Sequence, residues 1–199
     1  MKRIVLVMVL LAALAACTGK PAQAVRVLLE TSLGDIELEL YPAAAPLTVA
    51  NFLRLVDGGY LDGGSFYRTV SPENDNGSPP ISVIQGGLGD AESPFAPIAH
   101  ETTGVTGLVH RDGSISMARA EVGTASTEFF ICIGDQPALD FGGTRNADGQ
   151  GFAVFGRVVA GMEVVHAIHR SPADTPTDAA YFRNQVLNEP VQFISLRRL

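Results

Sequence analysis

Apolar and polar residues alternate in short segments along the chain, which is the pattern of half-buried β-strands. The clearest case is 36–40, where apolar residues alternate strictly with Glu. This segment follows the apolar run 25–29, and the residues 32–35 between them have the composition of a hairpin turn. Further short strands are predicted at 65–70, 81–85, 114–118, 128–133, 153–159 and 191–196.

Two segments have the helical period instead. After Pro46, apolar residues recur at Val49, Phe52 and Val56, and Gly58 ends the pattern. A second helix is predicted from residue 162 to about 169. Long loops, which are usually functional in a compact domain, are expected at 71–80, 134–151 and 171–190. Together these elements predict a mainly β fold, a closed eight-stranded antiparallel β-barrel capped by two α-helices.

The first residues resemble the export signal of a bacterial lipoprotein. Two basic residues precede the uncharged apolar run 4–16, which is shorter than the ~20 residues that a membrane-spanning helix needs. The run ends in Leu-Ala-Ala-Cys at 14–17, which resembles the lipobox. In lipoproteins that cysteine becomes the lipid-modified N-terminus after cleavage. We therefore expect a signal peptide at 1–16, lipidation of Cys17 with a short tether to residue 24, and one domain at 25–199.

The N-terminal signal also predicts a location. Thr18 follows the cysteine where inner-membrane retention signals usually have Asp. For a Gram-negative source this predicts a lipid anchor in the cell envelope, on the periplasmic face of the outer membrane. An ordinary secretory signal with an incidental cysteine is the alternative.

Composition and charge exclude several classes of protein. Hydrophobic residues make up 46% of the chain, which excludes a disordered protein. The formal net charge of −7 argues against a nucleic-acid partner, which needs a basic face. The 2 cysteines exclude a disulfide scaffold and a four-cysteine zinc site. Lipidation of Cys17 would leave Cys132 without a disulfide partner.

Nucleophilic and metal chemistry have little support in the sequence. Cys132 lies within a predicted strand, where a buried inert thiol is expected. Glu163, His166 and His169 recur along the second helix, but their arc is too wide for a convincing metal site. No glycine-rich phosphate loop precedes a helix. We therefore expect neither a metal nor a cofactor.

Five segments, in order along the chain, carry a family resemblance. They are Phe-Tyr-Arg-Thr-Val at 66–70, Val-Ile-Gln-Gly-Gly at 83–87, Ser-Met-Ala-Arg-Ala at 116–120, Ser-Thr-Glu-Phe-Phe-Ile at 126–131 and Phe-Ala-Val-Phe-Gly at 152–156. They resemble the successive signatures of cyclophilins, which are peptidyl-prolyl cis-trans isomerases. The resemblance covers roughly residues 25–199 and implies an eight-stranded barrel with two capping helices.

The resemblance also implies site residues. Arg68 would act on the prolyl nitrogen and Gln85 would orient Arg68. The implied substrate-binding positions are Val83, Ala118, Arg119, Glu128, Phe130, Leu139 and Phe152. Rotation about an X–Pro bond breaks no bond, so this chemistry requires neither a nucleophile nor a metal.

Strand parity offers a check that does not depend on the family, because residues i and i+2 of a strand share a face. Val83 and Gln85 share one face, and Ile84 takes the other. Likewise, Phe130 and its neighbour Phe129 lie on opposite faces of their strand. Site residues thus fall on one face and strongly apolar residues on the other, which predicts a packed barrel with a groove on its outside.

The match departs from the family at several places. Ser82 and Ala138 stand where cyclophilins often carry Phe and Trp, and Phe152 occupies a position often held by His. Segment 71–80 resembles an insertion that covers the groove or supplies apolar contacts. Because Arg119 and Glu128 have opposite charges, we hypothesise that Glu128 pairs with Arg119 or Arg68.

Three functions remain open at this point. The favoured one is a monomeric isomerase that binds proline-containing segments of unfolded or exported proteins. The second is a proline-peptide-binding chaperone or adaptor of the same fold with weak catalysis. The third is an unrelated β-barrel lipoprotein that holds a small ligand inside the barrel. A barrel interior filled by side chains would eliminate the third.

Overall fold

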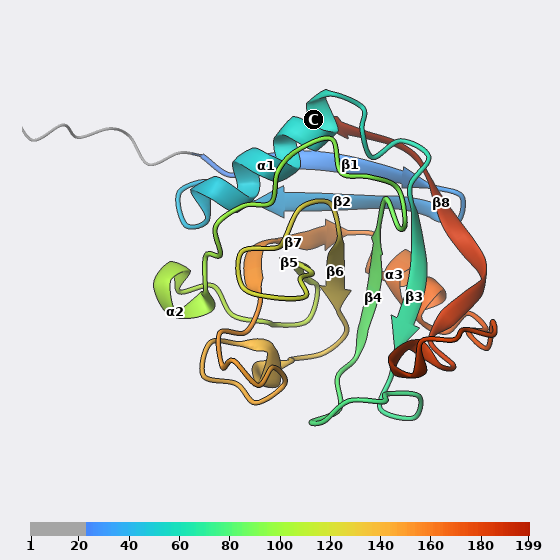
Figure 1. Cartoon of the computed structure of the whole chain (residues 1–199). Coiled ribbons are helices and arrows are strands. Elements are labelled where there is room, and N and C mark those ends of the chain that lie inside the picture. Colours follow the sequence, from blue (N-terminus) through green and yellow to red (C-terminus); the bar gives the residue numbers. More distant parts are fainter. Residues whose placement is uncertain (1–22) are drawn as a thin grey trace, which may run out of the picture.

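Eight strands pair side by side until the last closes on the first (Figure 1). In the computed structural model, which describes residues 23–199, their order is β1-β2-β7-β5-β6-β4-β3-β8, and every pairing is antiparallel. The strands are β1 (Val25–Thr31), β2 (Gly34–Leu40), β3 (Ser65–Val70), β4 (Val83–Gly87), β5 (Ser114–Met117), β6 (Phe129–Cys132), β7 (Ala153–Ala160) and β8 (Val186–Arg198). The predicted closed barrel is confirmed, and β8 begins earlier than expected. The expected signal peptide and Cys17 lie outside the described residues.

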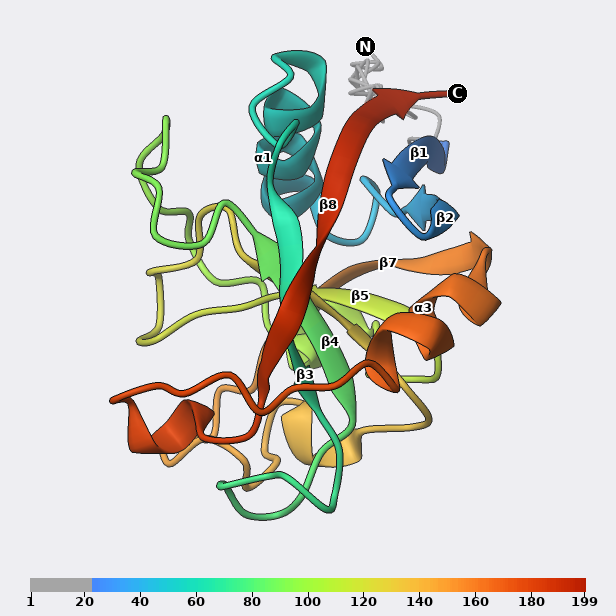
Figure 2. The same ribbon diagram turned by 90° about the vertical axis from the view of Figure 1, so that its right-hand side faces the viewer.

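Both predicted helices are present, α1 (Pro46–Asp57) and α3 (Met162–His169), and they lie on different sides of the barrel (Figure 2). The single turn α2 (Thr103–Thr106) was not predicted, because so short an element has no apolar period. Glu101 caps α1 from a distant loop, since its carboxylate accepts hydrogen bonds from the backbone N–H groups of Leu47 at 3.1 Å and Thr48 at 2.8 Å. Among residues 23–199, no helix is both long and apolar enough to cross a membrane.

Aromatic rings fill the interior of the barrel. Phe129 of β6 is fully buried, and its ring centroid lies 5.5 Å from that of Phe52, 5.8 Å from that of Phe66 and 5.9 Å from that of Phe193. The buried apolar side chains of α1 and α3 belong to the same cluster. Because side chains occupy this space, a barrel that holds a small ligand inside is ruled out.

A second apolar cluster lies on the other face of the same strands. It consists of Val70, Ile81, Val83, Phe130, Cys132 and Leu139. Val83 and Phe130 belong to it, whereas their neighbours Ile84 and Phe129 belong to the interior. The parity prediction is thereby confirmed, and the outer cluster forms the floor on which a groove is built.

Three long loops gather at one side of the barrel, at the lower edge of Figure 1. They are 71–82, 133–152 and 170–185, and the last two each contain a 3₁₀ turn, Pro137–Leu139 and Ala180–Phe182. Asp75 in the first loop and Arg145 in the second form an ion pair whose side chains are 0% and 3% exposed. These loops build a wall next to the outer cluster.

Truncating Phe129 to Ala should lower the free energy of unfolding by about 3–5 kcal/mol, because it leaves a cavity at the centre of the aromatic cluster. Phe141→Ala is the matched control, since that ring is 52% exposed, and it should cost about 1 kcal/mol or less. Urea denaturation of both variants measures the difference. Equal losses would show that Phe129 is not central to the core.

Candidate active site

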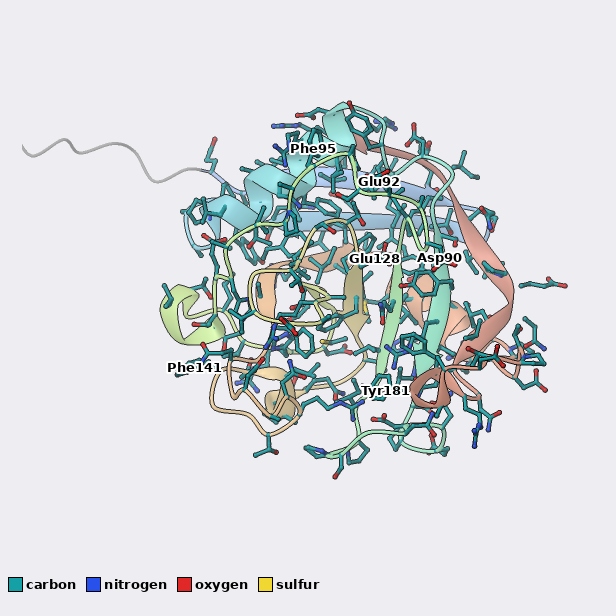
Figure 3. All side chains as sticks on the ribbon, viewed as in Figure 1. Asp90, Glu92, Phe95, Glu128, Phe141 and Tyr181 are labelled. Carbon is teal, nitrogen blue, oxygen red and sulfur yellow. The ribbon has the colours of Figure 1, made fainter. Side chains whose placement is uncertain are left out.

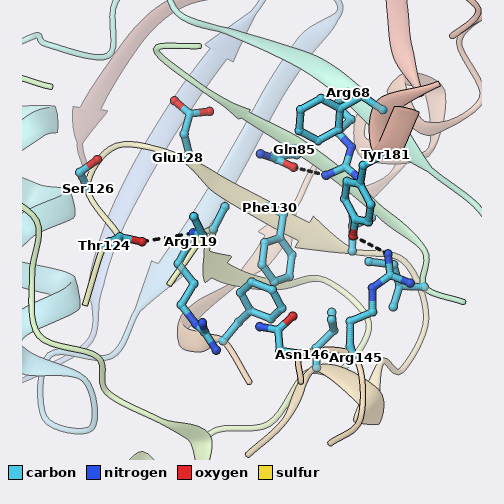
Figure 4. Close-up of a pocket in the computed structure, with 17 residues that line it drawn as sticks. Arg68, Gln85, Arg119, Thr124, Ser126, Glu128, Phe130, Arg145, Asn146 and Tyr181 are labelled. Atoms are coloured by element: carbon cyan, nitrogen blue, oxygen red, sulfur yellow. Dashed lines mark hydrogen bonds between the residues drawn. The ribbon is translucent and has the colours of Figure 1, made fainter. Parts of the chain in front are cut away.

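One cross-strand row places the central residues of the outer face. In the register of the sheet, Arg68 of β3 lies opposite Gln85 of β4, and Gln85 lies opposite Phe130 of β6. Residues directly opposite each other on paired strands share a face. A guanidinium, an amide and a phenyl ring are therefore neighbours on the outside of the barrel (Figure 4).

A β-bulge decides the face on which Arg68 lies. Phe66 points into the core, and simple alternation would place Arg68 on that face as well. The register of β3 shifts between Phe66 and Arg68, so that Tyr67 is the extra residue. Because a bulge re-aims the side chains that follow it, both Tyr67 and Arg68 face outward. Parity taken from sequence cannot detect this shift.

Arg68 is held by two amides rather than by an acid. Its Nη1 donates to Gln85 Oε1 at 2.7 Å, and its Nε and Nη2 donate to Gln185 Oε1 at 3.0 and 2.6 Å. Three of the five N–H groups of the guanidinium are thus engaged. Burial lowers the pKa of Arg68, but an arginine remains charged at neutral pH. Within residues 23–199 no carboxylate forms an ion pair with it, so its charge is available to a bound molecule.

The outer groove has a volume of about 650 Å³. All the residues implied from sequence line it, namely Arg68, Val83, Gln85, Ala118, Arg119, Glu128, Phe130, Leu139 and Phe152. The structure therefore brings the predicted set together, while the role of each residue stays a prediction. Further lining residues are Ile81, Ala120, Thr124, Ser126, Arg145, Asn146, Tyr181 and Phe182.

The predicted pairing of Glu128 is wrong. Arg119 turns away from Glu128 (Figure 4) and donates to Asp148 at 2.7 and 2.9 Å and to the carbonyl of Gly151. Glu128 Oε2 instead accepts a hydrogen bond from the Tyr67 hydroxyl at 2.6 Å. The bulge is the reason, because it brings Tyr67 to the outer face next to Glu128.

Glu128 nevertheless reaches Arg68 through a chain of hydrogen bonds. Gln85 Nε2 donates to the Tyr67 hydroxyl at 2.9 Å, and this hydroxyl donates to Glu128. Because its amide N–H is engaged by Tyr67, Gln85 presents its oxygen to Arg68. Burial, followed by the negative charge of Glu128, raises the pKa of Tyr67. The phenol therefore stays protonated and can serve as the donor.

Phe130 is supported from behind by a buried polar cluster. Its ring stacks on His110 with centroids 5.8 Å apart and meets Phe152 edge-on at 5.3 Å. His110 Nδ1 lies 2.7 Å from Asp140 Oδ1, and its Nε2 lies 3.0 Å from Ser116 Oγ. This order of groups resembles a hydrolytic triad, but Ser116 is 0% exposed and cannot reach a substrate. The cluster positions Phe130.

Burial favours the neutral form of His110 in this cluster. The pKa of His110 is lowered by burial, against the opposing effect of Asp140. A neutral imidazole fits both contacts, because Nδ1–H donates to Asp140 and Nε2 accepts from Ser116. The hydrogen bonds from His110 hold the pKa of Asp140 below its ordinary value despite burial.

The remaining sequence predictions concern Cys132, metal binding and segment 71–80. Cys132 is buried, as predicted, and burial raises the pKa of its thiol. His169 Nε2 lies 2.9 Å from the carbonyl oxygen of Val70, and among residues 23–199 no three acidic, histidine or cysteine side chains are grouped as metal ligands. No residue of segment 71–80 lines the groove, so the segment neither covers the groove nor supplies apolar contacts to it. It binds Arg145, which does line the groove, through Asp75.

Sequence reasoning missed three residues of the last loop. Gln185 is fully buried and binds Arg68, while the rings of Phe182 and Tyr181 lie 4.6 and 5.1 Å from the Arg68 guanidinium carbon. An adjacent aromatic pair in an otherwise polar loop was the only available signal. Nothing in the sequence indicated that this loop returns to β3.

The chain has clear relatives of known type. Residues 26–193 match the model of the family described as cyclophilin type peptidyl-prolyl cis-trans isomerase/CLD. The chain is 33% identical over 174 residues to a peptidyl-prolyl cis-trans isomerase of Acinetobacter baylyi, covering 85% of this chain and 82% of that protein. It is 38% identical over 147 residues to peptidyl-prolyl cis-trans isomerase A of Dickeya dadantii, covering 71% and 70%.

Solved structures share the fold. A cyclophilin type peptidyl-prolyl cis-trans isomerase of Cryptosporidium parvum matches with a TM-score of 0.66 and 22% identity, covering 88% of this chain and 98% of that chain. The same protein has also been solved in the presence of the dipeptide Ala-Pro, and that structure matches with a TM-score of 0.65 and 21% identity, covering 87% and 98%.

Acid should destabilise the protein through His110. Burial holds the pKa of folded His110 below the ordinary histidine value of ~6.5. Below about pH 6.5 the unfolded state therefore binds a proton that the folded state does not, and the free energy of unfolding falls as the pH falls. One such proton accounts for at most ~1.4 kcal/mol per pH unit. Free energies of unfolding between pH 8 and 5 measure the slope, which should be shallower below pH 6.5 in His110→Gln. The same slope in both proteins would contradict a neutral buried His110.

Proposed function

Because the chain belongs to the cyclophilin-type peptidyl-prolyl cis-trans isomerase family, we propose that its outer groove is the active site and that Arg68 acts on the prolyl bond. The protein is a peptidyl-prolyl cis-trans isomerase of this family. The reaction rotates an X–Pro amide, whose resonance opposes rotation by ~18–20 kcal/mol. Catalysis must therefore stabilise the twisted amide rather than cleave a bond.

Arg68 has the chemistry that a twisted amide requires. As conjugation is lost, the prolyl nitrogen regains a lone pair that accepts a hydrogen bond. A donor aimed at that nitrogen binds the transition state better than the ground state, which is the condition for catalysis. Gln85 and Gln185 engage three N–H groups of Arg68 and leave two for the substrate. Both amides act as positioning residues for the guanidinium.

The floor of the groove suits a proline ring. Val83, Phe130 and Leu139 belong to one buried apolar cluster, and Ala118 and Phe152 pack against it. A proline ring is apolar, and it lies next to the bond that rotates. The observation that carries the proposal is this placement of an apolar pocket beside the Arg68 guanidinium, which has no acidic partner among the described residues. The Cryptosporidium protein, which shares this fold, was solved in the presence of the dipeptide Ala-Pro, and this supports the proposal of a proline-binding groove.

We further propose that the protein works at a membrane surface on exported, proline-containing chains. The support is the N-terminal sequence, with its apolar run and the Leu-Ala-Ala-Cys at 14–17. A tether over 18–24 spans at most ~25 Å when fully extended. A lipid on Cys17 would therefore keep the groove close to the membrane, where exported chains emerge unfolded.

Arg68→Ala should lower kcat/KM by about 10²–10³-fold, by analogy with the loss of an oxyanion-hole donor, and should weaken peptide binding much less. Arg68→Lys should restore little, because an ammonium lacks the planar fork of donors. Arg157→Ala is the matched control, since this arginine is 59% exposed and lies outside the groove. Isomerisation kinetics and peptide affinity are measured on the same folded variants.

Two outcomes would contradict this role of Arg68. Equal losses of activity and affinity in Arg68→Ala would make Arg68 a binding residue and would favour the weakly catalytic peptide binder. Full activity in Arg68→Ala would exclude the mechanism altogether. Circular dichroism of each variant shows that a loss does not come from unfolding.

Cys17→Ser should release the protein from the membrane fraction or leave it unprocessed, because serine cannot carry the thioether-linked lipid. Membrane fractionation in a bacterial host and the intact mass of the mature chain are the measurements. Cys132→Ala also removes a thiol and should leave both results unchanged. A Cys17→Ser protein with unaltered fractionation and mature mass would count against lipidation.

A further inference from the structure

An aromatic pair borders the Arg68 end of the groove and has no part in the proposed reaction step. Tyr181 and Phe182 are consecutive residues of the 3₁₀ turn Ala180–Phe182, and both line the groove. Their rings lie close to the Arg68 guanidinium, yet they remain 47% and 36% exposed. Figure 3 shows Tyr181 beside the lower ends of β3 and β4. Exposed rings at the mouth of a groove offer surface to a bound chain.

Contacts with two other loops hold this pair in place. The Tyr181 hydroxyl accepts a hydrogen bond from Arg145 Nη2 at 2.8 Å (Figure 4). Asn76 Nδ2 donates to the backbone carbonyls of Tyr181 at 3.2 Å and Arg183 at 2.8 Å. Further along, Gln185 Nε2 donates to the carbonyl of Asn74 at 2.8 Å. The rings are therefore presented in a fixed arrangement, which lowers the entropic cost of binding to them.

The charges around the pair define what it can accept. Arg145 is neutralised by Asp75, with two hydrogen bonds at 2.7 and 2.8 Å. Among residues 23–199, the side chains that accept hydrogen bonds from Arg68 are the neutral amides of Gln85 and Gln185, and the two rings lie over its guanidinium. A second cation here would meet the Arg68 charge, whereas an aromatic or large aliphatic side chain would gain ring contacts. The surface therefore favours apolar side chains and disfavours Lys and Arg.

We propose that Tyr181 and Phe182 form a specificity subsite for an aromatic or large aliphatic side chain next to the proline. Successive residues of an extended chain are ~3.3–3.6 Å apart, so a residue adjacent to a proline beside Arg68 reaches rings 4.6 and 5.1 Å from that guanidinium. The proposal rests on the groove being the active site. It adds which flanking residue the enzyme selects.

Peptides that differ only in one flanking residue test this subsite. Two series vary the residue before or after a single proline among Ala, Leu, Phe and Lys. In the wild type, kcat/KM for Phe should exceed that for Ala by about threefold to tenfold at one of the two positions, and Lys should be the poorest. Peptide affinities from NMR titration should follow the same order, which keeps the test valid if catalysis is weak.

The double variant Tyr181→Ala/Phe182→Ala should bring the Phe-to-Ala ratio close to one. Tyr181→Phe retains the ring and should retain the ratio. Tyr60→Ala is the matched control, because Tyr60 is 46% exposed and packs on Phe95 outside the groove lining, and it should leave the ratio unchanged. If the double variant kept the wild-type Phe-to-Ala ratio of kcat/KM, even with uniformly slower rates, the subsite would be excluded. The two rings would then only shield Arg68 from solvent.

Discussion

The groove depends on the bulge at Tyr67 more than on any other feature of the backbone. By adding one residue to β3, the bulge turns Arg68 away from the core and sets it opposite Gln85. The same extra residue supplies the phenol that joins Gln85 to Glu128. One irregularity thus orients the guanidinium and also fixes the amide that holds it. Without the bulge, a charged side chain would point into an aromatic core, at a large desolvation cost.

The strands β4 and β6 serve two purposes at once, because alternate side chains point to opposite faces. Ile84 and Phe129 hold the barrel closed from within, whereas Gln85 and Phe130 form the site outside. Hydrophobic burial in the interior keeps the backbone rigid, and this rigidity positions the outer row. The barrel interior is therefore packed with side chains and supports the groove on the outside, rather than enclosing a ligand.

The long loops add the aromatic wall beside Arg68, which the barrel strands alone do not provide. The ion pair of Asp75 and Arg145 is almost completely buried, and Arg145 also binds the Tyr181 hydroxyl. Burying such an ion pair costs desolvation free energy, but separating the two partners would leave a buried charge without compensation. Loop arrangements that separate Asp75 from Arg145 are therefore strongly disfavoured. Through this pair, a segment that hardly touches the groove decides where the aromatic wall beside Arg68 lies.

Local sequence patterns were sufficient to predict the barrel strands, the helices α1 and α3, and the two faces of β4 and β6. The reason is that apolar residues recur with a period of 2.0 in strands and 3.6 in helices, and both periods can be recognised in the sequence. The residues of the groove followed from the family resemblance together with that parity. Contacts between distant segments were decided only by the tertiary structure. Glu101 caps a helix 53 residues away, Gln185 binds an arginine 117 residues away, and Glu128 meets Tyr67 rather than an opposite charge. Such pairs depend on bulges and loop paths, which leave no periodic signal in the sequence.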